Sequence, residues 1–334
     1  MKKVSLFFPA LTFFLLIGKI TDGQQKYLFE QPKMGSPFTI TIYGNDSMAA
    51  SAAAFRKADT LNAVFSDYID SSELNRLSAT SGQGRYVVVS APLFTILQRS
   101  LEAARLSKGS FDVTIGPVVK VWRQARKRKV FPNADTLKAA LQKTGYRYIH
   151  LDSIHQSVWL EKPGMQLDLG GLGKGFVAQA ALNLLEEYGF HAAMVNAGGK
   201  IVIGQAPPGK QGWMIGINAP GEKEQILPGL LLLQHIAIAT SGDIYQYVEL
   251  NGKRYSHIVD PATGIGLTRS RNVTVIAADG TDADWLATAC SVLSFRASLK
   301  LIRHFPGAAL FVSEIRNGKI VHKSSPHFSN YQMK

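Results

Sequence analysis

The chain has 334 residues, and a hydrophobic content of 46% is enough for a globular protein with a substantial core. Its formal net charge is +13, but the basic residues are scattered except from Arg123 to Lys129, and no aromatic residues are interleaved with them. We therefore expect no nucleic-acid binding, and we interpret that run as a solvated helix end in preference to a docking patch. The single cysteine, Cys290, excludes an internal disulfide and is expected to be a small buried hydrophobe.

The first 23 residues are typical of a secretory signal. Lys2 and Lys3 precede an apolar run from Val4 to Ile17, which is shorter than the ~20 residues of a membrane-spanning helix. Cleavage and retention as an N-terminal anchor both stay open. We predict an exported protein, either periplasmic or membrane-associated on the outer face of the inner membrane, in which residues 24–334 form a single domain.

Apolar periodicity predicts the helices of the chain. They cover Ser47 to Ser66, Ala91 to Leu106, Pro117 to Lys127, Ala134 to Lys143, Lys174 to Tyr188 and Asp282 to His304. Short apolar runs, often flanked by Gly, Asn, Asp or Pro, predict strands at Phe38 to Tyr43, Tyr148 to Leu151, Ser157 to Leu160, Ala192 to Val195, Trp213 to Ile217, Ile236 to Ala239, Tyr245 to Leu250, Asn272 to Ala278 and Ala309 to Val312. Helices predominate before residue 145 and strands after 190. The order predicts an α+β fold, either with two lobes joined near Leu167 to Gly175 or as one continuous domain.

Two segments in the first half combine turn residues with candidate ligand contacts. The segment from Ser66 to Leu74 predicts an N-cap followed by a short helix, and it also places Tyr68 where a flat ligand could stack. Gly109 to Pro117 leads into a predicted helix. Asp112 in that segment is either a structural turn residue or a ligand contact.

Two glycine-rich turns follow. Leu167-Asp168-Leu-Gly170-Gly171-Leu-Gly173-Lys174-Gly175 joins a predicted strand to a helix, and its backbone N–H groups and lysine suit a phosphate group. The spacing fits neither a Walker A loop nor a dinucleotide fingerprint, so a plain strand-to-helix turn is the alternative. Val195-Asn196-Ala197-Gly198-Gly199 is either a second close-approach turn or a simple hairpin.

The segment from Tyr255 to Thr288 is the most informative. His257 directly precedes an Asp260-Pro261 turn, so we place it at the end of a strand. Asp284 and Thr288 are four residues apart, share one face of a predicted helix, and offer oxygen atoms to one hard cation. Taken singly, each has a structural interpretation: a turn histidine, an acid in the first helical turn, and a threonine bonded back to the helix. Taken together, they predict a magnesium site beside a histidine.

These segments occur in one order that resembles the ApbE family, the FAD:protein FMN transferases. The resemblance includes Met34-Gly-Ser and Ala239-Thr-Ser-Gly-Asp243 and extends from about Met34 to Leu293. It implies a two-lobed fold related to the tunnelling fold, with mixed sheets and flanking helices. It also implies an Mg²⁺-dependent transfer of FMN from FAD to a threonine or serine hydroxyl of a partner protein, with release of AMP.

The resemblance further implies roles for individual residues. The residues expected to contact FAD are Met34, Tyr68, Ser110, Phe111, Asp112, Asp168, Lys174, His257 and Ile258. The residues expected to bind Mg²⁺ are Gly171 through its carbonyl, and Asp284 and Thr288 through their side chains. Asp284 and His257 are the catalytic candidates, and the task of His257 stays open between positioning or deprotonating the incoming hydroxyl and stabilising charge at phosphorus.

The chain departs from the family pattern at two positions. Lys200 stands where the family turn Asn-Ala-Gly-Gly-Asp ends in an acid, and Ala262 stands where the family has arginine.

The expected acceptor is an exported protein with a Ser/Thr-Gly-Ala-Ser/Thr motif. Two rival functions follow from the same residues: an FAD pyrophosphatase that releases free FMN and AMP, and a non-catalytic flavin-binding module.

Overall fold

The computed structural model describes residues 25–220, 225–242 and 246–333. The predicted signal segment and Asp243 lie outside these residues. Within them, no helix is both long and apolar enough to cross a membrane.

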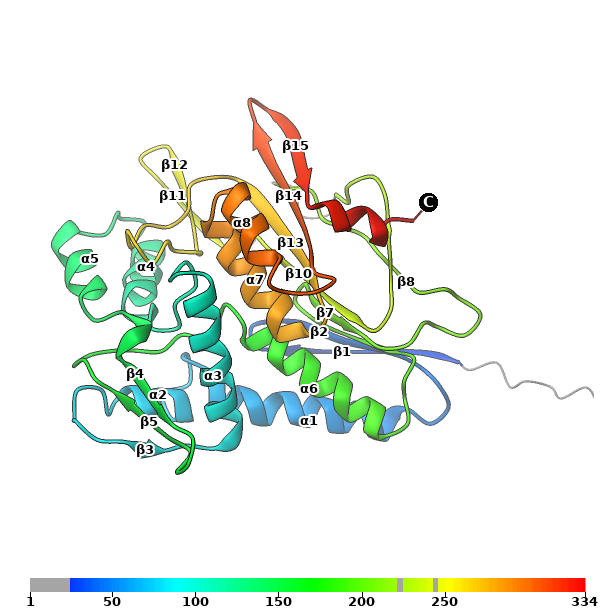
Figure 1. Ribbon diagram of the computed structural model, residues 1–334, viewed down its shortest axis with the longest axis horizontal. Coiled ribbons are helices and arrows are strands. Elements are labelled where there is room, and N and C mark those ends of the chain that lie inside the picture. The colour runs from blue at the N-terminus through cyan, green and yellow to red at the C-terminus, as the bar shows by residue number, and fades with distance from the viewer. Residues whose placement is uncertain (1–24, 221–224, 243–245, 334) are drawn as a thin grey trace, which may run out of the picture.

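An eight-stranded antiparallel sheet forms the larger lobe (Figure 1). Its strand order is β1-β2-β6-β7-β10-β13-β14-β15. The strands are β1 (Lys26–Lys33), β2 (Ser36–Tyr43), β6 (Ala193–Ala197), β7 (Lys200–Ile203), β10 (Ile236–Ser241), β13 (Arg271–Ala277), β14 (Ala309–Arg316) and β15 (Lys319–Ser324). All seven residues of β13 are buried, which is expected of a central strand covered on both faces.

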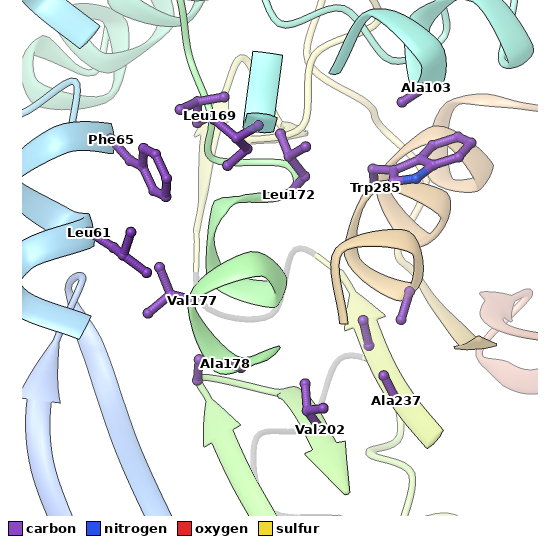
Figure 2. Close-up of a cluster of buried hydrophobic side chains, with 14 of the residues drawn as sticks. Leu61, Phe65, Ala103, Leu169, Leu172, Val177, Ala178, Val202, Ala237 and Trp285 are labelled. Atoms are coloured by element: carbon purple, nitrogen blue, oxygen red, sulfur yellow. The ribbon is translucent and has the colours of Figure 1, made fainter. Parts of the chain in front are cut away.

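Helices cover one face of this sheet. They are α1 (Met48–Phe65), α6 (Gly173–Glu187) and α7 (Gly280–Val292), followed by α8 (Phe295–Ile302). Ala237 and Ala239 of β10 point to the core beneath these helices, whereas Ile238 points to the opposite core. Figure 2 shows Leu61 and Phe65 of α1 facing Val177 of α6, with Trp285 of α7 on the other side of α6 near Ala103. The opposite face is covered by the β8 (Trp213–Ile215) and β9 (Leu231–Leu233) hairpin and the short helix η2 (Pro326–Tyr331).

The smaller lobe lies beside α1 and α6 (Figure 1). It contains α2 (Glu73–Ser78), α3 (Ala91–Leu106), α4 (Gly116–Arg128), α5 (Ala134–Leu141), the short helix η1 (Tyr146–Tyr148) and a sheet of β3 (Val87–Val88), β5 (Ser157–Leu160) and β4 (Ile149–Asp152). A separate small core packs α4 and α5 against the hairpin of β11 (Tyr247–Leu250) and β12 (Lys253–Ser256). The α+β, two-lobed architecture expected from the sequence is confirmed.

A pair of glycines brings α6 and α7 into backbone contact. A Cβ on Gly175 would lie 2.0 Å from the carbonyl oxygen of Gly280, and a Cβ on Gly280 would lie 2.5 Å from that of Gly175. Since neither position has room for a side chain, the two helices cross at this point at the closest distance that backbones allow. The crossing also places Asp284 of α7 against the first turn of α6.

The predicted helix from Asp282 to His304 is wrong, because the chain breaks between α7 and α8. Arg271, at the start of β13, donates from one guanidinium nitrogen to the carbonyls of Cys290 and Leu293, the latter at 3.1 Å. Ser294 then caps α8 by accepting from the N–H of Ala297. An arginine from the preceding strand therefore binds the last carbonyls of one helix, and a local serine caps the next. Cys290 is fully buried, as expected.

The short helix predicted within Ser66 to Leu74 begins further along the chain than expected, at Glu73. Its N-cap is Ser72, which accepts from the N–H of Asn75, while Ser66 ends α1 and accepts from the N–H of Tyr68. The turn at Gly198 and Gly199 is a hairpin between β6 and β7, with positive φ at both glycines. The hairpin interpretation of that segment is therefore confirmed.

Candidate active site

Asp284 is the most buried carboxylate of the site. Its side chain is 1% exposed, and its Oδ2 accepts a hydrogen bond of 2.9 Å from the N–H of Gly175. Its Oδ1 is buried and accepts no hydrogen bond. A buried carboxylate oxygen without a donor is costly unless a cation neutralises it.

Thr288 and Gly171 lie beside this carboxylate. The Thr288 hydroxyl is 3.2 Å from the carbonyl oxygen of Gly171 and 3.2 Å from that of Asp284, and 3.5 Å from the Ser241 hydroxyl. A Cβ on Gly171 would lie 3.4 Å from the Thr288 hydroxyl oxygen and 2.9 Å from the Phe111 ring, so the glycine permits this approach. The structure thus brings Gly171 next to Thr288, one helical turn from Asp284, as the sequence predicted.

Lys200 and Lys174 supply positive charge to the same region. The Lys200 ammonium donates to the Thr240 carbonyl at 2.6 Å and lies 3.6 Å from Asp284 Oδ1. The Lys174 ammonium lies 3.6 Å from the position that a Cβ would take on Gly198. Burial and the charge of Lys200 lower the pKa of Lys174, whereas the charge of Asp284 opposes that effect. We call Asp284, Lys174 and Lys200 the lysine cluster.

These residues fit a hard divalent cation in their donor chemistry. A carboxylate, a hydroxyl and a carbonyl are oxygen ligands, and Mg²⁺ binds few protein ligands while keeping several waters. Among the described residues, no three His, Cys, Asp or Glu side chains are arranged so that they could hold a metal ion together. The predicted set has one carboxylate, so it does not depend on such a cluster. Asp284 Oδ1, which accepts no hydrogen bond, is the atom that a divalent cation would bind.

His257 follows β12, at the strand end predicted for it. Its ring Nδ1 lies 3.0 Å from the Gln246 carbonyl oxygen, and its backbone N–H donates to the same oxygen at 3.0 Å. Because a carbonyl only accepts, Nδ1 carries the proton and Nε2 keeps its lone pair. Burial, with smaller contributions from the positive charges of Arg126, Lys200 and Lys174, lowers the pKa of His257 to about 4, against the opposing effect of the hydrogen bond to Gln246. The imidazole is neutral at neutral pH.

A second charged cluster lies at the other end of the glycine-rich loop. The Arg123 guanidinium pairs with Asp67 at 2.5 Å and with Asp168 at 3.3 Å, and it stacks 4.0 Å from the centroid of the Tyr68 ring. Asp168 also accepts from the N–H of Gly170 at 2.7 Å. Burial raises the pKa of Asp168, and the charge of Asp67 adds to this effect, whereas Arg123 opposes it. We call Asp67, Arg123 and Asp168 the arginine cluster.

Tyr68 is 71% exposed, so one aromatic ring face next to this cluster stays open to solvent.

Asp112 is buried, and both of its carboxylate oxygens accept hydrogen bonds within the chain. Its Oδ1 accepts from the backbone and hydroxyl of Thr114, and its Oδ2 accepts from the N–H of Tyr146. Burial raises the pKa of this carboxyl, and these hydrogen bonds oppose it. The contact between Asp112 and FAD stays a prediction, while its structural role in the turn is evident.

The remaining predicted contacts surround the glycine-rich loop. Phe111 is buried against Trp285, and Ser110 is half-buried just before it. The methyl group of Met34 lies 3.9 Å from the position of a Cβ on Gly173. Ile258 lines a cavity of about 300 Å³ together with Ser256, Asp260 and Arg271.

Two arginines of the site were not predicted from the sequence. Arg123 and Arg126 belong to the run that we interpreted as a solvated helix end. That interpretation is correct for Lys127 to Lys129, which are exposed, but wrong for the two arginines, which are partly buried. Arg126 lies 3.4 Å from the side-chain oxygen of Gln246, whose carbonyl orients His257. The three-residue spacing of the two arginines, which places them on one face of α4 next to Trp122, was the available signal.

Comparison with known proteins identifies the class. The model of the ApbE family matches residues 34–312, and the chain belongs to this family. It is 34% identical to an FAD:protein FMN transferase of Treponema pallidum (strain Nichols), over 84% of this chain and 82% of that relative. It is 32% identical to an FAD:protein FMN transferase of Klebsiella pneumoniae (strain 342), over 77% of this chain and 79% of that relative.

Solved structures agree with the fold. The ApbE protein from Thermotoga maritima superimposes with a TM-score of 0.83 at 27% identity, covering 93% of this chain and 100% of that chain. The flavin transferase ApbE from Vibrio cholerae also gives a TM-score of 0.83, at 25% identity, covering 92% of this chain and 99% of that one. The family resemblance stated from the motifs is therefore confirmed.

Proposed function

We propose that this protein transfers the FMN moiety of FAD to a threonine or serine hydroxyl of an acceptor protein, forming a phosphoester and releasing AMP. The observation that carries the proposal is the convergence of Asp284, Gly171 and Thr288 in a site that also receives lysines from two other elements. Membership of the ApbE family and similarity to two proteins named FAD:protein FMN transferase support it.

Asp284, Thr288 and the Gly171 carbonyl would hold Mg²⁺. When bound, this cation supplies positive charge to the pyrophosphate oxygens of FAD. The chain itself adds the Lys174 ammonium in the first turn of α6, where the positive end of the helix dipole also favours an anion. FAD is the substrate, and the open ring face of Tyr68 is available to stack on one of its aromatic rings.

We propose that His257 acts as a general base. The Gln246 carbonyl fixes the proton on Nδ1, so Nε2 accepts the proton of the incoming hydroxyl. The hydroxyl oxygen then forms a bond to the phosphorus of the FMN half, and the bond from that phosphorus to the oxygen of the AMP half breaks. The bonding electrons leave with AMP. Because His257 is neutral at neutral pH, it needs no prior deprotonation.

The acceptor and the compartment rest on the sequence. We propose an exported acceptor with a Ser/Thr-Gly-Ala-Ser/Thr motif, and a location in the periplasm or at the outer face of the inner membrane. The signal-like start of the chain motivates this assignment.

Incubation of the protein with FAD, Mg²⁺ and an acceptor peptide containing that motif tests the function. We expect a fluorescent peptide whose mass has increased by one FMN, with an equal amount of AMP. A peptide in which both hydroxyl residues are replaced by valine and alanine is the control and should stay unmodified. Absence of an adduct with several motif-bearing acceptors would contradict the transfer.

The same assay separates transfer from hydrolysis, since water is the competing nucleophile. Free FMN released at the same rate with and without the acceptor would identify a pyrophosphatase. FAD binding without AMP release in the presence of Mg²⁺ would identify a non-catalytic flavin-binding module.

A further inference from the structure

Lys200 occupies an unusual position for a lysine. It is the first residue of β7, directly after the glycine turn, and it pairs with Ala239 of β10. Its side chain is only 12% exposed, and its ammonium lies between the Thr240 carbonyl at 2.6 Å and Asp284 Oδ1 at 3.6 Å. The second distance is too long for a hydrogen bond but short enough for strong attraction between opposite charges.

Asp284 carries one negative charge, and the Lys200 ammonium already lies close to it. A divalent cation can bind there only if further negative charge is added or the ammonium moves away. Asp284 is 1% exposed, and its Oδ1 has Lys200 as its nearby positive charge. A divalent cation on Oδ1 would lie close to the Lys200 ammonium, and one carboxylate cannot neutralise both. The pyrophosphate of FAD supplies the additional negative charge that makes both cations acceptable.

We infer that Lys200 is a positioning residue that neutralises Asp284 until FAD and a divalent cation bind together. When the cation takes Asp284 Oδ1, the ammonium is released and binds an anionic oxygen of the FAD pyrophosphate. This inference rests on the metal site of the proposed function. Its consequence is that the cation binds weakly to the protein alone and much more tightly in the presence of FAD, because each ligand favours the other.

Binding of Mn²⁺, measured by the electron paramagnetic resonance signal of the free ion, tests this directly and needs no turnover. In the variant Lys200→Met, Mn²⁺ should bind the FAD-free protein about tenfold more tightly than in the wild type, because the competing charge is gone. The factor by which FAD increases Mn²⁺ affinity should be smaller in the variant than in the wild type. Damage to the fold would weaken binding, so tighter binding is a signature that a merely structural role does not give.

Two control variants make the comparison specific. Lys57→Met removes the same charge from an exposed position of α1 and should leave Mn²⁺ affinity unchanged. Lys200→Arg keeps the charge and should retain weak binding without FAD. If Lys200→Met does not fold, as judged by circular dichroism, Lys200→Gln is measured in its place.

Mn²⁺ affinity that stays equal or falls in the folded, uncharged variant would overturn the inference about Lys200. Failure of the metal assignment has a different signature. If Asp284→Asn leaves the Mn²⁺ affinity of the wild type unchanged, the cation does not bind at Asp284, and the metal site of the proposed function is wrong whatever Lys200 does.

Discussion

The arginine cluster and the lysine cluster lie at opposite ends of the same glycine-rich loop, and their carboxylates are neutralised differently. Arg123 pairs with both Asp67 and Asp168, and Asp168 has a further donor in the N–H of Gly170. In the lysine cluster, Asp284 Oδ1 has no hydrogen bond, and its nearest cation is 3.6 Å away. The first arrangement is complete within the chain and stabilises its shape. The second has the Lys200 ammonium nearby but leaves Asp284 Oδ1 without a hydrogen bond, as the proposed cation site requires.

Replacing Asp284 with Asn tests the lysine cluster and should have the largest effect. The amide oxygen keeps the hydrogen bond from Gly175, so the fold should persist, while the negative charge is lost. We expect AMP release to fall by about a hundredfold to a thousandfold, by analogy with other losses of charge stabilisation in transition states. Measurement of AMP release and of FAD affinity separates the two effects. Unchanged turnover would contradict the assignment of Asp284 to the metal.

Replacing His257 with Gln removes the proposed base. Loss of a general base costs roughly 10² to 10⁴ in rate, so the chemical step should slow by about a hundredfold or more. Single-turnover transfer to the acceptor peptide gives this rate. Substitution of His155, which is 72% exposed and pairs with Asp152, is a matched control and should leave the rate unchanged.

The pH dependence of the same residue gives a further test. Since its folded pKa is about 4 and its usual value is near 6.5, His257 should stay neutral throughout the range between them. Over that range the unfolded chain binds a proton that the folded protein does not, so this residue lowers stability as pH falls from 6.5 towards 4. An NMR titration of the imidazole C–H signals gives the midpoint. A midpoint near 6.5 would contradict the burial described for the ring.

Replacing Arg123 with Met tests the arginine cluster and should act on stability. Two largely buried carboxylates would lose their counter-ion, which typically costs about 3 kcal/mol of unfolding free energy. Urea denaturation measures the loss, and Arg128→Met at the exposed end of the same helix is the control. The loss should shrink at low pH, because burial raises the pKa of Asp168 and the protonated acid needs no counter-ion.

Replacing Tyr68 with Ala should have the smallest effect and the most selective one. The ring is 71% exposed, so stability should change little, while loss of one stacking contact of about 1 to 3 kcal/mol should weaken FAD binding about tenfold. Tyr86, which is 48% exposed and packs on Trp159, supplies the control Tyr86→Ala. Equal FAD affinity in both variants would remove Tyr68 from the flavin site.

Local patterns predicted the elements well, and long-range contacts account for what was missed. The helix from Ala91 to Leu106 was predicted at its observed bounds, because its periodicity and its Ser90 cap are local. The break after α7 depends on Arg271, which reaches the helix end from β13. Apolar periodicity does not reveal that contact, so it predicted one continuous helix where the structure has α7 and α8.

The site shows the same limit. Asp284, Thr288 and Gly171 could be brought together from helical spacing and family resemblance, and the structure places them side by side. Lys200 was noticed as a departure, but only the pairing of β7 with β10 reveals that its ammonium reaches Asp284. Arg123 looked like a solvated residue because the acids that bind it are 56 residues before it, at Asp67, and 45 residues after it, at Asp168.

The glycine contact between α6 and α7 has a mechanical consequence. With no side chain between Gly175 and Gly280, the two helices cannot slide or tilt against each other without a collision of their backbones. The carboxylate of Asp284 and the first turn of α6 are consequently held in a fixed relation, which the hydrogen bond from the Gly175 N–H to Asp284 reinforces. Under the proposed function, we therefore expect any adjustment that admits FAD to come from the smaller lobe, whose α4 is linked to the loop before α6 by the ion pair between Arg123 and Asp168.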